Sequence, residues 1–223
     1  MFDKSLYDAF LFDFDGLLVD SERLHYKAYM MMFQKKGLFL DWDFDVFCNY
    51  AHVDSDYFQK NVYKALPELT QMQISWRDLK KEKQIIYFEL LKDETIVPMP
   101  GVEFFLNQLA ESNKAMCVVT NSPRQDIDYI RNKLPQLDCI KHWITREDYK
   151  NPKPAPDGYK LGLSILKGKK AAGFEDSIKG VRALIQASID PYFIHPSGNV
   201  KSLEIQTDKK IHCYESFEQL LGL

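Results

Sequence analysis

Short apolar runs alternate with amphipathic helical segments along most of this chain, and that alternation restricts the fold more than any other feature. The apolar runs lie at residues 9–15, 115–120, 170–174 and 191–195. Helical periods follow at residues 102–109, 127–134, 159–166 and 181–185. Apolar runs of this length suit strands buried on both faces of a parallel sheet. The order predicts an α/β protein with a doubly wound (Rossmann-like), mostly parallel sheet, in which ligands bind beyond the carboxyl ends of the strands.

One long segment interrupts the alternation. Between residues 17 and 97 the sequence is helical and polar in character and holds no comparable apolar run. A chain of 223 residues is long enough to bury one large core and to carry an insertion. We therefore predict a core domain of residues 1–16 and 98–223, interrupted by a helical cap domain of residues 17–97.

Charge and cysteine content limit the partners of the chain. With 29 basic and 32 acidic residues the net charge is -3, whereas nucleic-acid binders usually carry a basic excess. No apolar stretch reaches the length of a membrane span, and the acidic start does not resemble a secretion signal. The four cysteines form no C-x-x-C pair, and we expect no histidine at metal-ligand spacing around them. We expect a cytoplasmic monomer that binds neither nucleic acid nor membranes.

Acidic pairs follow two of the predicted strands. Asp13 and Asp15 end the first apolar run, and Glu175 and Asp176 end the third. Carboxyl ends of parallel strands share one edge of the sheet, so we expect four converging carboxylates. All-oxygen ligands without Cys or His favour a hard cation such as Mg²⁺. The alternative for the second pair is that Asp176 or Ser177 caps the next helix.

Two further segments place polar groups where a phosphate could bind. Thr120, Asn121 and Ser122 end the second apolar run, and their hydroxyls, amide and backbone N–H groups could form a phosphate cradle. The alternative is simple helix capping before a proline. Lys153 lies in a loop with three prolines that could hold its ammonium in place, although loop lysines are usually solvated.

The joint order of these motifs resembles that of the haloacid dehalogenase superfamily, in particular its helical-cap phosphatases and β-phosphoglucomutase-like enzymes. The first motif is matched by the segment DFDGLLVDSE, from Asp13 to Glu22. The later segments TNS, KPAPD and FEDS follow in the same order. The resemblance covers essentially the whole predicted sheet domain, and it matches the cap mainly in placement and in its first helix.

This resemblance implies a phosphatase mechanism. Asp13 would be the nucleophile that forms an aspartyl-phosphate, and Asp15 would be the general acid and base. Thr120, Asn121 and Lys153 would hold the phosphoryl oxygens. Mg²⁺ would be held by Asp13, by the Asp15 carbonyl, by Asp176 and by Glu175. The expected substrate is a small phosphorylated metabolite, such as a sugar phosphate.

The cap leaves alternatives open. His25 falls where β-phosphoglucomutase-like relatives carry a substrate-facing histidine, and otherwise it is a helix-surface histidine. A sugar-phosphate mutase is an alternative function, but residues 48–66 contain neither glycine nor arginine, so the specificity loop typical of mutases is not recognisable. A further alternative is a catalytically weak interaction module.

Overall fold

The computed structural model describes residues 2–168, 170–195, 208 and 210–222. The chain divides into two compact units, one of Met1–Asp20 with Val97–Leu223 and one of Ser21–Ile96. The dividing points lie at Asp20 and Val97, whereas the sequence analysis placed them at Gly16 and Pro98. Residues after Gly16 stay with the first unit because Val19 bridges both Asp15 and Pro98.

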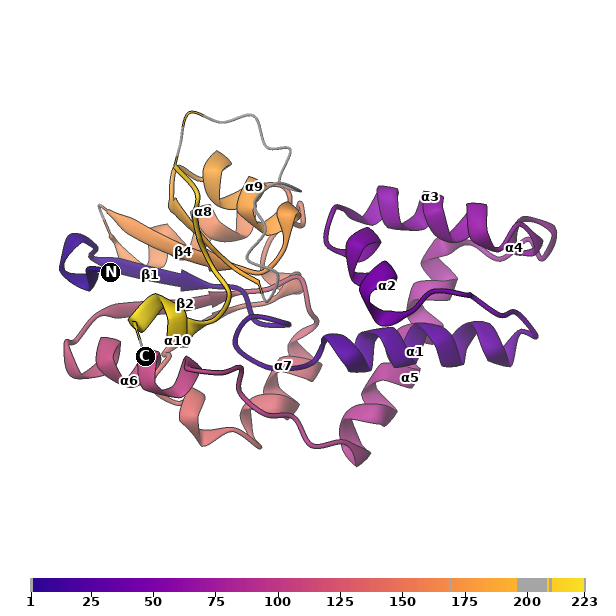
Figure 1. Ribbon diagram of the computed structural model, residues 1–223, viewed down its shortest axis with the longest axis horizontal. Helices are drawn as coiled ribbons and strands as arrows, with labels where there is room; N and C mark the ends of the chain where they lie inside the picture. The colour runs from indigo at the N-terminus through magenta and orange to yellow at the C-terminus, as the bar shows by residue number, and fades with distance from the viewer. Residues whose placement is uncertain (1, 169, 196–207, 209, 223) are drawn as a thin grey trace. The chain divides into compact units, whose positions relative to one another are not determined.

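Among the residues described, the first unit, here called the sheet unit, contains six parallel strands (Figure 1). They run in the order β3-β2-β1-β4-β5-β6, and each neighbouring pair is parallel. This confirms the predicted doubly wound sheet. The central strand β1 is the point where the order reverses, which is where such sheets bind ligands. The strands are β1 Ala9–Phe12, β2 Ala115–Val119, β3 His142–Ile144, β4 Ala171–Glu175, β5 Asp190–Ile194 and β6 His212–Tyr214.

Helices cover both faces of this sheet (Figure 1). On one face Leu11 packs in a cluster with Tyr159 of α8 and Leu184 of α9. On the other face Phe12 contacts Phe105 of α6 and Phe174 of β4 through its ring. The alternation of side chains along β1 therefore supplies both halves of the core. The helices are α6 Val102–Glu111, α7 Arg124–Arg131, α8 Asp157–Leu166, α9 Ile178–Gln186 and α10 Phe217–Leu221, with 3-10 turns η1 Lys4–Leu6, η2 Pro135–Leu137 and η3 Arg146–Asp148.

The second unit, here called the helical unit, is built around aromatic side chains. The ring of Phe58 lies 5.1 Å from that of Tyr29, 5.3 Å from that of Phe47 and 5.9 Å from that of Trp76. Aromatic pairs at such distances contribute packing energy beyond their buried area. Its helices are α1 Glu22–Lys35, α2 Phe44–Ala51, α3 Ser55–Ala65, α4 Glu68–Gln71 and α5 Trp76–Asp93.

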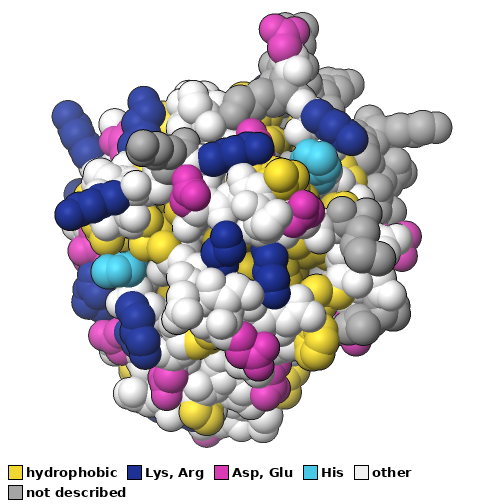
Figure 2. Space-filling view, turned by 90° about the vertical axis from the view of Figure 1, so that its left-hand side faces the viewer, with side chains coloured by type: hydrophobic (Ala, Val, Ile, Leu, Met, Phe, Trp, Pro, Cys, Tyr) yellow, Lys and Arg dark blue, Asp and Glu magenta, His cyan; other side chains and the backbone are white. Residues whose placement is uncertain are grey.

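Surface charge agrees with the nearly balanced composition. Figure 2 shows the end of the sheet unit at which β1 begins, where basic and acidic side chains are interspersed. Among the residues that the structure describes, none of the helices combines the length and the apolar character that a membrane crossing requires.

Candidate active site

Three carboxylates gather at the carboxyl ends of two neighbouring strands. Asp13 follows β1, and its backbone N–H donates to the Phe174 carbonyl of β4 at 3.0 Å. Glu175 is the last residue of β4, and Asp176 follows it. Carboxylate oxygens of Asp13, Glu175 and Asp176 all lie within 4.8 Å of one another, and all three residues are buried. Asp13 and Glu175 are separated by more than half of the sequence, and the parallel pairing of β1 with β4 brings them together.

Lys153 supplies a cation to this acidic cluster. Its Nζ lies 2.8 Å from Oδ1 of Asp13 and 2.6 Å from Oε1 of Glu175, and its side chain is only 3% exposed. Burial disfavours its charge, but the two neighbouring carboxylates outweigh that effect and hold the pKa of Lys153 above its usual range. Lys153 thus pairs with two of the three clustered acids, and a set of three carboxyl groups suits a divalent cation.

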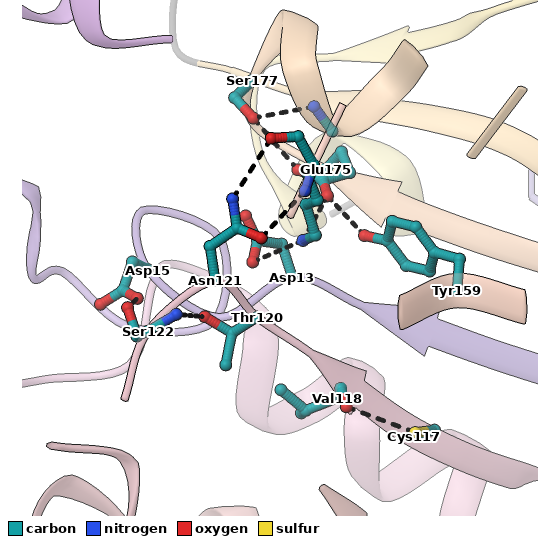
Figure 3. A network of polar contacts seen from close by, with 12 residues as sticks. Asp13, Asp15, Cys117, Val118, Thr120, Asn121, Ser122, Tyr159, Glu175 and Ser177 are labelled. Carbon is teal, nitrogen blue, oxygen red and sulfur yellow. Dashed lines mark hydrogen bonds and ion pairs between the residues drawn. The ribbon is translucent and has the colours of Figure 1, made fainter. Parts of the chain in front are cut away.

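Glu175 is held by donors on several elements (Figure 3). Its Oε1 accepts from Lys153 Nζ and from the Tyr159 hydroxyl of α8, and its Oε2 accepts from Ser177 Oγ at 3.3 Å. Burial raises the pKa of Glu175 to about 7, and the Asp13 carboxylate adds to that rise while Lys153 opposes it. The site therefore contains a carboxyl group whose charge depends on its neighbours near neutral pH.

Gly180 of α9 makes room for this carboxylate. A Cβ at position 180 would lie 1.9 Å from Cδ of Glu175, which no real side chain tolerates. The helix start that carries Gly180 is capped by Ser177, whose Oγ accepts from the Gly180 N–H at 3.3 Å. Ser177 thus acts as the N-cap, as the sequence suggested, and also binds Glu175.

Asp15 is held apart from the three clustered acids. Its Oδ2 accepts from Ser122 Oγ at 2.5 Å, and Figure 3 shows its carboxylate beside Ser122 rather than beside Asp13. The expectation of four converging carboxylates is therefore met by three. The physical reason is the turn after Asp13, where Gly16 adopts a φ of 75° and its N–H donates to Val19 at 3.0 Å.

The segment after β2 is braced against the loop that carries Lys153. Oδ1 of Asn121 accepts from the Lys153 N–H at 3.1 Å and from the Tyr149 hydroxyl at 2.7 Å. The buried Thr120 accepts the Ser122 N–H on its hydroxyl at 2.9 Å, and its carbonyl accepts from Tyr149 at 2.7 Å. These bonds position the ends of β2 and of the lysine loop beside the acidic cluster.

His25 belongs to the helical unit and is described there. Its ring stacks on Tyr87 with centroids 4.1 Å apart, and its Nδ1 lies 2.6 Å from Nζ of the buried Lys83. A lysine ammonium can only donate, so Nδ1 is the acceptor in this contact. His25 is therefore a partly buried, paired residue of α1 rather than a solvated histidine.

Sequence reasoning missed several residues that shape these sites. Tyr159, Tyr149 and Gly180 lie on helices and loops whose sequence carries no pattern for a carboxylate partner. Ser122 was recognised as part of a polar segment, but its bond to Asp15 was not anticipated. Lys83 reads in the sequence as one of several helix lysines, and only packing shows that it is buried.

The fold and the site together define a class of protein. A doubly wound sheet places carboxylates and one buried lysine at the strand where its order reverses, an arrangement suited to binding a phosphate group together with a cation. The model of the haloacid dehalogenase-like hydrolases matches residues 10–193 of this chain. The chain belongs to this family, as its motif order predicted.

Characterised relatives match along most of their length. The chain is 28% identical over 207 residues to a phosphorylated carbohydrates phosphatase of Thermotoga maritima, covering 88% of this chain and 89% of that protein. It is 26% identical over 192 residues to a validoxylamine A 7'-phosphate phosphatase of Streptomyces hygroscopicus subsp. limoneus, covering 82% and 84%. A β-phosphoglucomutase structure from Clostridium difficile shares the fold with a TM-score of 0.72, 22% identity and coverage of 96% and 92%.

Proposed function

We propose that this chain is a Mg²⁺-dependent phosphatase that hydrolyses a small phosphorylated metabolite, such as a sugar phosphate, through an aspartyl-phosphate on Asp13. The observation that carries the proposal is the buried Asp13 carboxylate, which faces Lys153 at 2.8 Å within a cluster of three acids. The relatives named as a phosphorylated carbohydrates phosphatase and as a validoxylamine A 7'-phosphate phosphatase support the substrate class.

The acidic cluster fits a magnesium ion. Its ligand atoms are all oxygens, and they come from three buried carboxyl groups. Asp13, Glu175 and Asp176 would hold the ion with their side chains, and Asp15 would add its carbonyl. When bound, the ion neutralises charge on the phosphate and on the carboxylates that would otherwise repel it.

The residues of the chain divide the chemistry between them. A carboxylate oxygen of Asp13 attacks phosphorus as the bond from phosphorus to the ester oxygen breaks, and Asp15 gives its proton to the departing oxygen. Asp15 then takes a proton from the water that attacks the aspartyl-phosphate, which releases phosphate and restores Asp13. Lys153 and the Thr120–Asn121 segment hold the phosphoryl oxygens in both steps.

The helical unit is proposed to act as the cap that selects the substrate. Its partly buried His25, paired with the buried Lys83, is the residue of this unit that we assign to contact with a polar, phosphorylated molecule. This assignment depends on the chemistry of the pair and on the family resemblance of the first cap helix.

A phosphate-release assay over a panel of phosphorylated carbohydrates tests the proposal. We expect release that requires Mg²⁺, stops in EDTA, and falls at least about a thousandfold in Asp13→Asn. Asp8→Asn is the matched control, because Asp8 is an exposed aspartate just before the other end of β1, and it should keep full activity.

Three results would contradict the proposal. Undiminished phosphate release by the Asp13→Asn variant would show that Asp13 is not the nucleophile. Conversion of a hexose 1-phosphate to its 6-phosphate without net phosphate release would replace hydrolysis by a mutase reaction. A folded protein without turnover on any phosphate ester would favour an interaction module.

A further inference from the structure

A second group of metal-ligating side chains lies in the helical unit. Glu22, Cys48 and His52 each offer one ligand atom, and these three atoms lie within 4.8 Å of one another. Within the group, Nε2 of His52 is 3.5 Å from Oε2 of Glu22. The group lies wholly in the helical unit, so its geometry does not depend on the sheet unit.

Two of these ligands lie one turn apart at the end of α2, Cys48 within the helix and His52 as its C-cap residue. Cys48 and His52 are four residues apart, and the backbone N–H of His52 donates to the Cys48 carbonyl at 3.0 Å. Residues at this spacing are neighbours on a helix surface. The expectation that no histidine lies at metal-ligand spacing from a cysteine is wrong for this pair.

The third ligand comes from the start of α1. Glu22 is the first residue of that helix, and the ring of Tyr26, one turn later, packs on Phe44 and Phe47 of α2 at 5.8 and 5.4 Å. Packing between the two helices therefore fixes Glu22 relative to Cys48 and His52. An ion held by all three side chains would link α1 to α2.

The spacing of the ligand atoms is close to that of a tetrahedral site. Bonds of about 2.0–2.3 Å to a tetrahedral zinc ion put neighbouring ligand atoms about 3.3–3.8 Å apart. The 3.5 Å between His52 and Glu22 already falls in this range. Any pair at the 4.8 Å limit needs to close by about 1 Å, which side-chain rotation supplies.

We propose that Glu22, Cys48 and His52 form a binding site for Zn²⁺ or a similar thiophilic divalent cation. Thiolate, imidazole and carboxylate ligands suit zinc, whereas the all-oxygen cluster around Asp13 suits magnesium. Cys48 loses its thiol proton to solvent as the thiolate binds the metal. Three protein ligands leave the fourth position of a tetrahedral ion for water.

Co²⁺ is the probe that tests this site, because a cobalt–thiolate bond gives a charge-transfer absorption that oxygen ligands do not. The apo protein carries Asp13→Asn and Asp176→Asn, so that the cluster in the sheet unit no longer competes for the ion. We expect one equivalent of Co²⁺ to produce the thiolate band and one equivalent of Zn²⁺ to remove it. Zn²⁺ should also raise the unfolding temperature, since it binds the folded chain.

Substitutions assign the band to its ligands. Cys48→Ser should abolish it, and His52→Gln should weaken Co²⁺ binding at least about tenfold. Cys139→Ser is the matched control, because Cys139 is also partly buried but lies in the sheet unit, and the band should persist in it. Circular dichroism confirms that each variant is folded.

The proposal is overturned if no thiolate band forms at one equivalent, or if the band survives in a folded Cys48→Ser variant. It is also overturned if His52→Gln leaves the Co²⁺ affinity unchanged, because the Glu22–His52 contact would then be an ion pair only. None of these outcomes bears on phosphatase activity.

Discussion

Replacing Lys153 by methionine removes the one ammonium that faces Asp13 and Glu175 while keeping most of the side-chain volume. The Lys153 Nζ lies 2.8 Å from Asp13 and 2.6 Å from Glu175, and the Glu175 carboxylate is fully buried. Breaking a buried ion pair by removing one partner costs about 3–5 kcal/mol, because the remaining charge is left uncompensated. We expect Lys153→Met to lower the free energy of unfolding of the metal-free sheet unit by about that amount at pH 8.

The loss should depend on pH in a defined direction. The pKa of Glu175 is raised in the folded chain from 4.5 to about 7, so its protonation favours the fold, and that contribution is lost as the pH rises through about 7. Without Lys153, which lowers this pKa, Glu175 keeps its proton to higher pH. The loss of stability in Lys153→Met should therefore be larger at pH 8 than at pH 5, growing by about 1.4 kcal/mol for each pH unit between the Glu175 pKa of the wild type and that of the variant.

Urea unfolding followed by tryptophan fluorescence measures this difference. Trp143 lies in the sheet unit and Trp42 and Trp76 in the helical unit, so a Trp42→Phe/Trp76→Phe background reports on the sheet unit alone. Lys150→Met, in the same loop but exposed, is the control and should change stability by less than about 0.5 kcal/mol.

A second substitution should restore part of the stability that Lys153→Met loses. Adding Glu175→Gln to Lys153→Met removes the second buried charge, and the double variant should recover at least about 1 kcal/mol. A loss in Lys153→Met no larger than in Lys150→Met, or a double variant less stable than Lys153→Met, would refute the view that charge compensation holds this cluster together.

Three further substitutions test other parts of the structure. Gly180→Ala should lower the unfolding free energy of the sheet unit by about 1–3 kcal/mol, because its Cβ would meet the Glu175 carboxylate; an unchanged urea midpoint would contradict this. Asp54→Ala should lower the unfolding free energy of the helical unit by about 1 kcal/mol, because Oδ1 of Asp54 caps α3 by accepting from the Tyr57 N–H at 2.7 Å. An unchanged thermal unfolding temperature, followed by circular dichroism, would argue against this cap. Ser122→Ala should lower kcat about tenfold with little change in KM, because Ser122 orients Asp15; steady-state kinetics with only KM altered would show a binding role instead.

The sheet could be predicted from sequence because its strands are marked by composition. The apolar runs at β1, β2, β4 and β5 are buried on both faces. Continuous apolar runs of this kind are typical of strands inside a parallel sheet that helices cover on both sides. The short strands β3 and β6 are only partly buried, and no apolar run marked β3. Edge strands of three residues carry too little pattern to be recognised.

The acidic cluster could be predicted in part for a related reason. Asp13 directly follows β1 and Glu175 is the last residue of β4, and these strands pair in parallel, so the positions of the two acids at strand ends were enough to bring them together. Asp15 departs from the expectation because a tight turn at Gly16 redirects the chain within a few residues of the strand. Local backbone conformation of this kind is not encoded in the period of the strand.

Contacts between elements account for what the sequence did not show. The Tyr159 hydroxyl reaches Glu175 from α8, and Gly180 leaves space for the same carboxylate from α9. Both roles depend on how helices pack on β4, which no single segment determines. The Cys48–His52 spacing was visible in the sequence, but the contribution of Glu22 from another helix required the structure.

Trapping the phosphorylated enzyme tests the central proposal most directly. The protein is mixed with Mg²⁺ and a phosphorylated carbohydrate that it hydrolyses, quenched in acid during turnover, and reduced with borohydride, which converts an acyl phosphate of aspartate to homoserine. Mass spectrometry of the peptide that spans β1 should find homoserine at position 13 and unmodified aspartate at position 15. Turnover with no modification at Asp13, or with the modification at another residue, would contradict the assignment of Asp13 as the nucleophile.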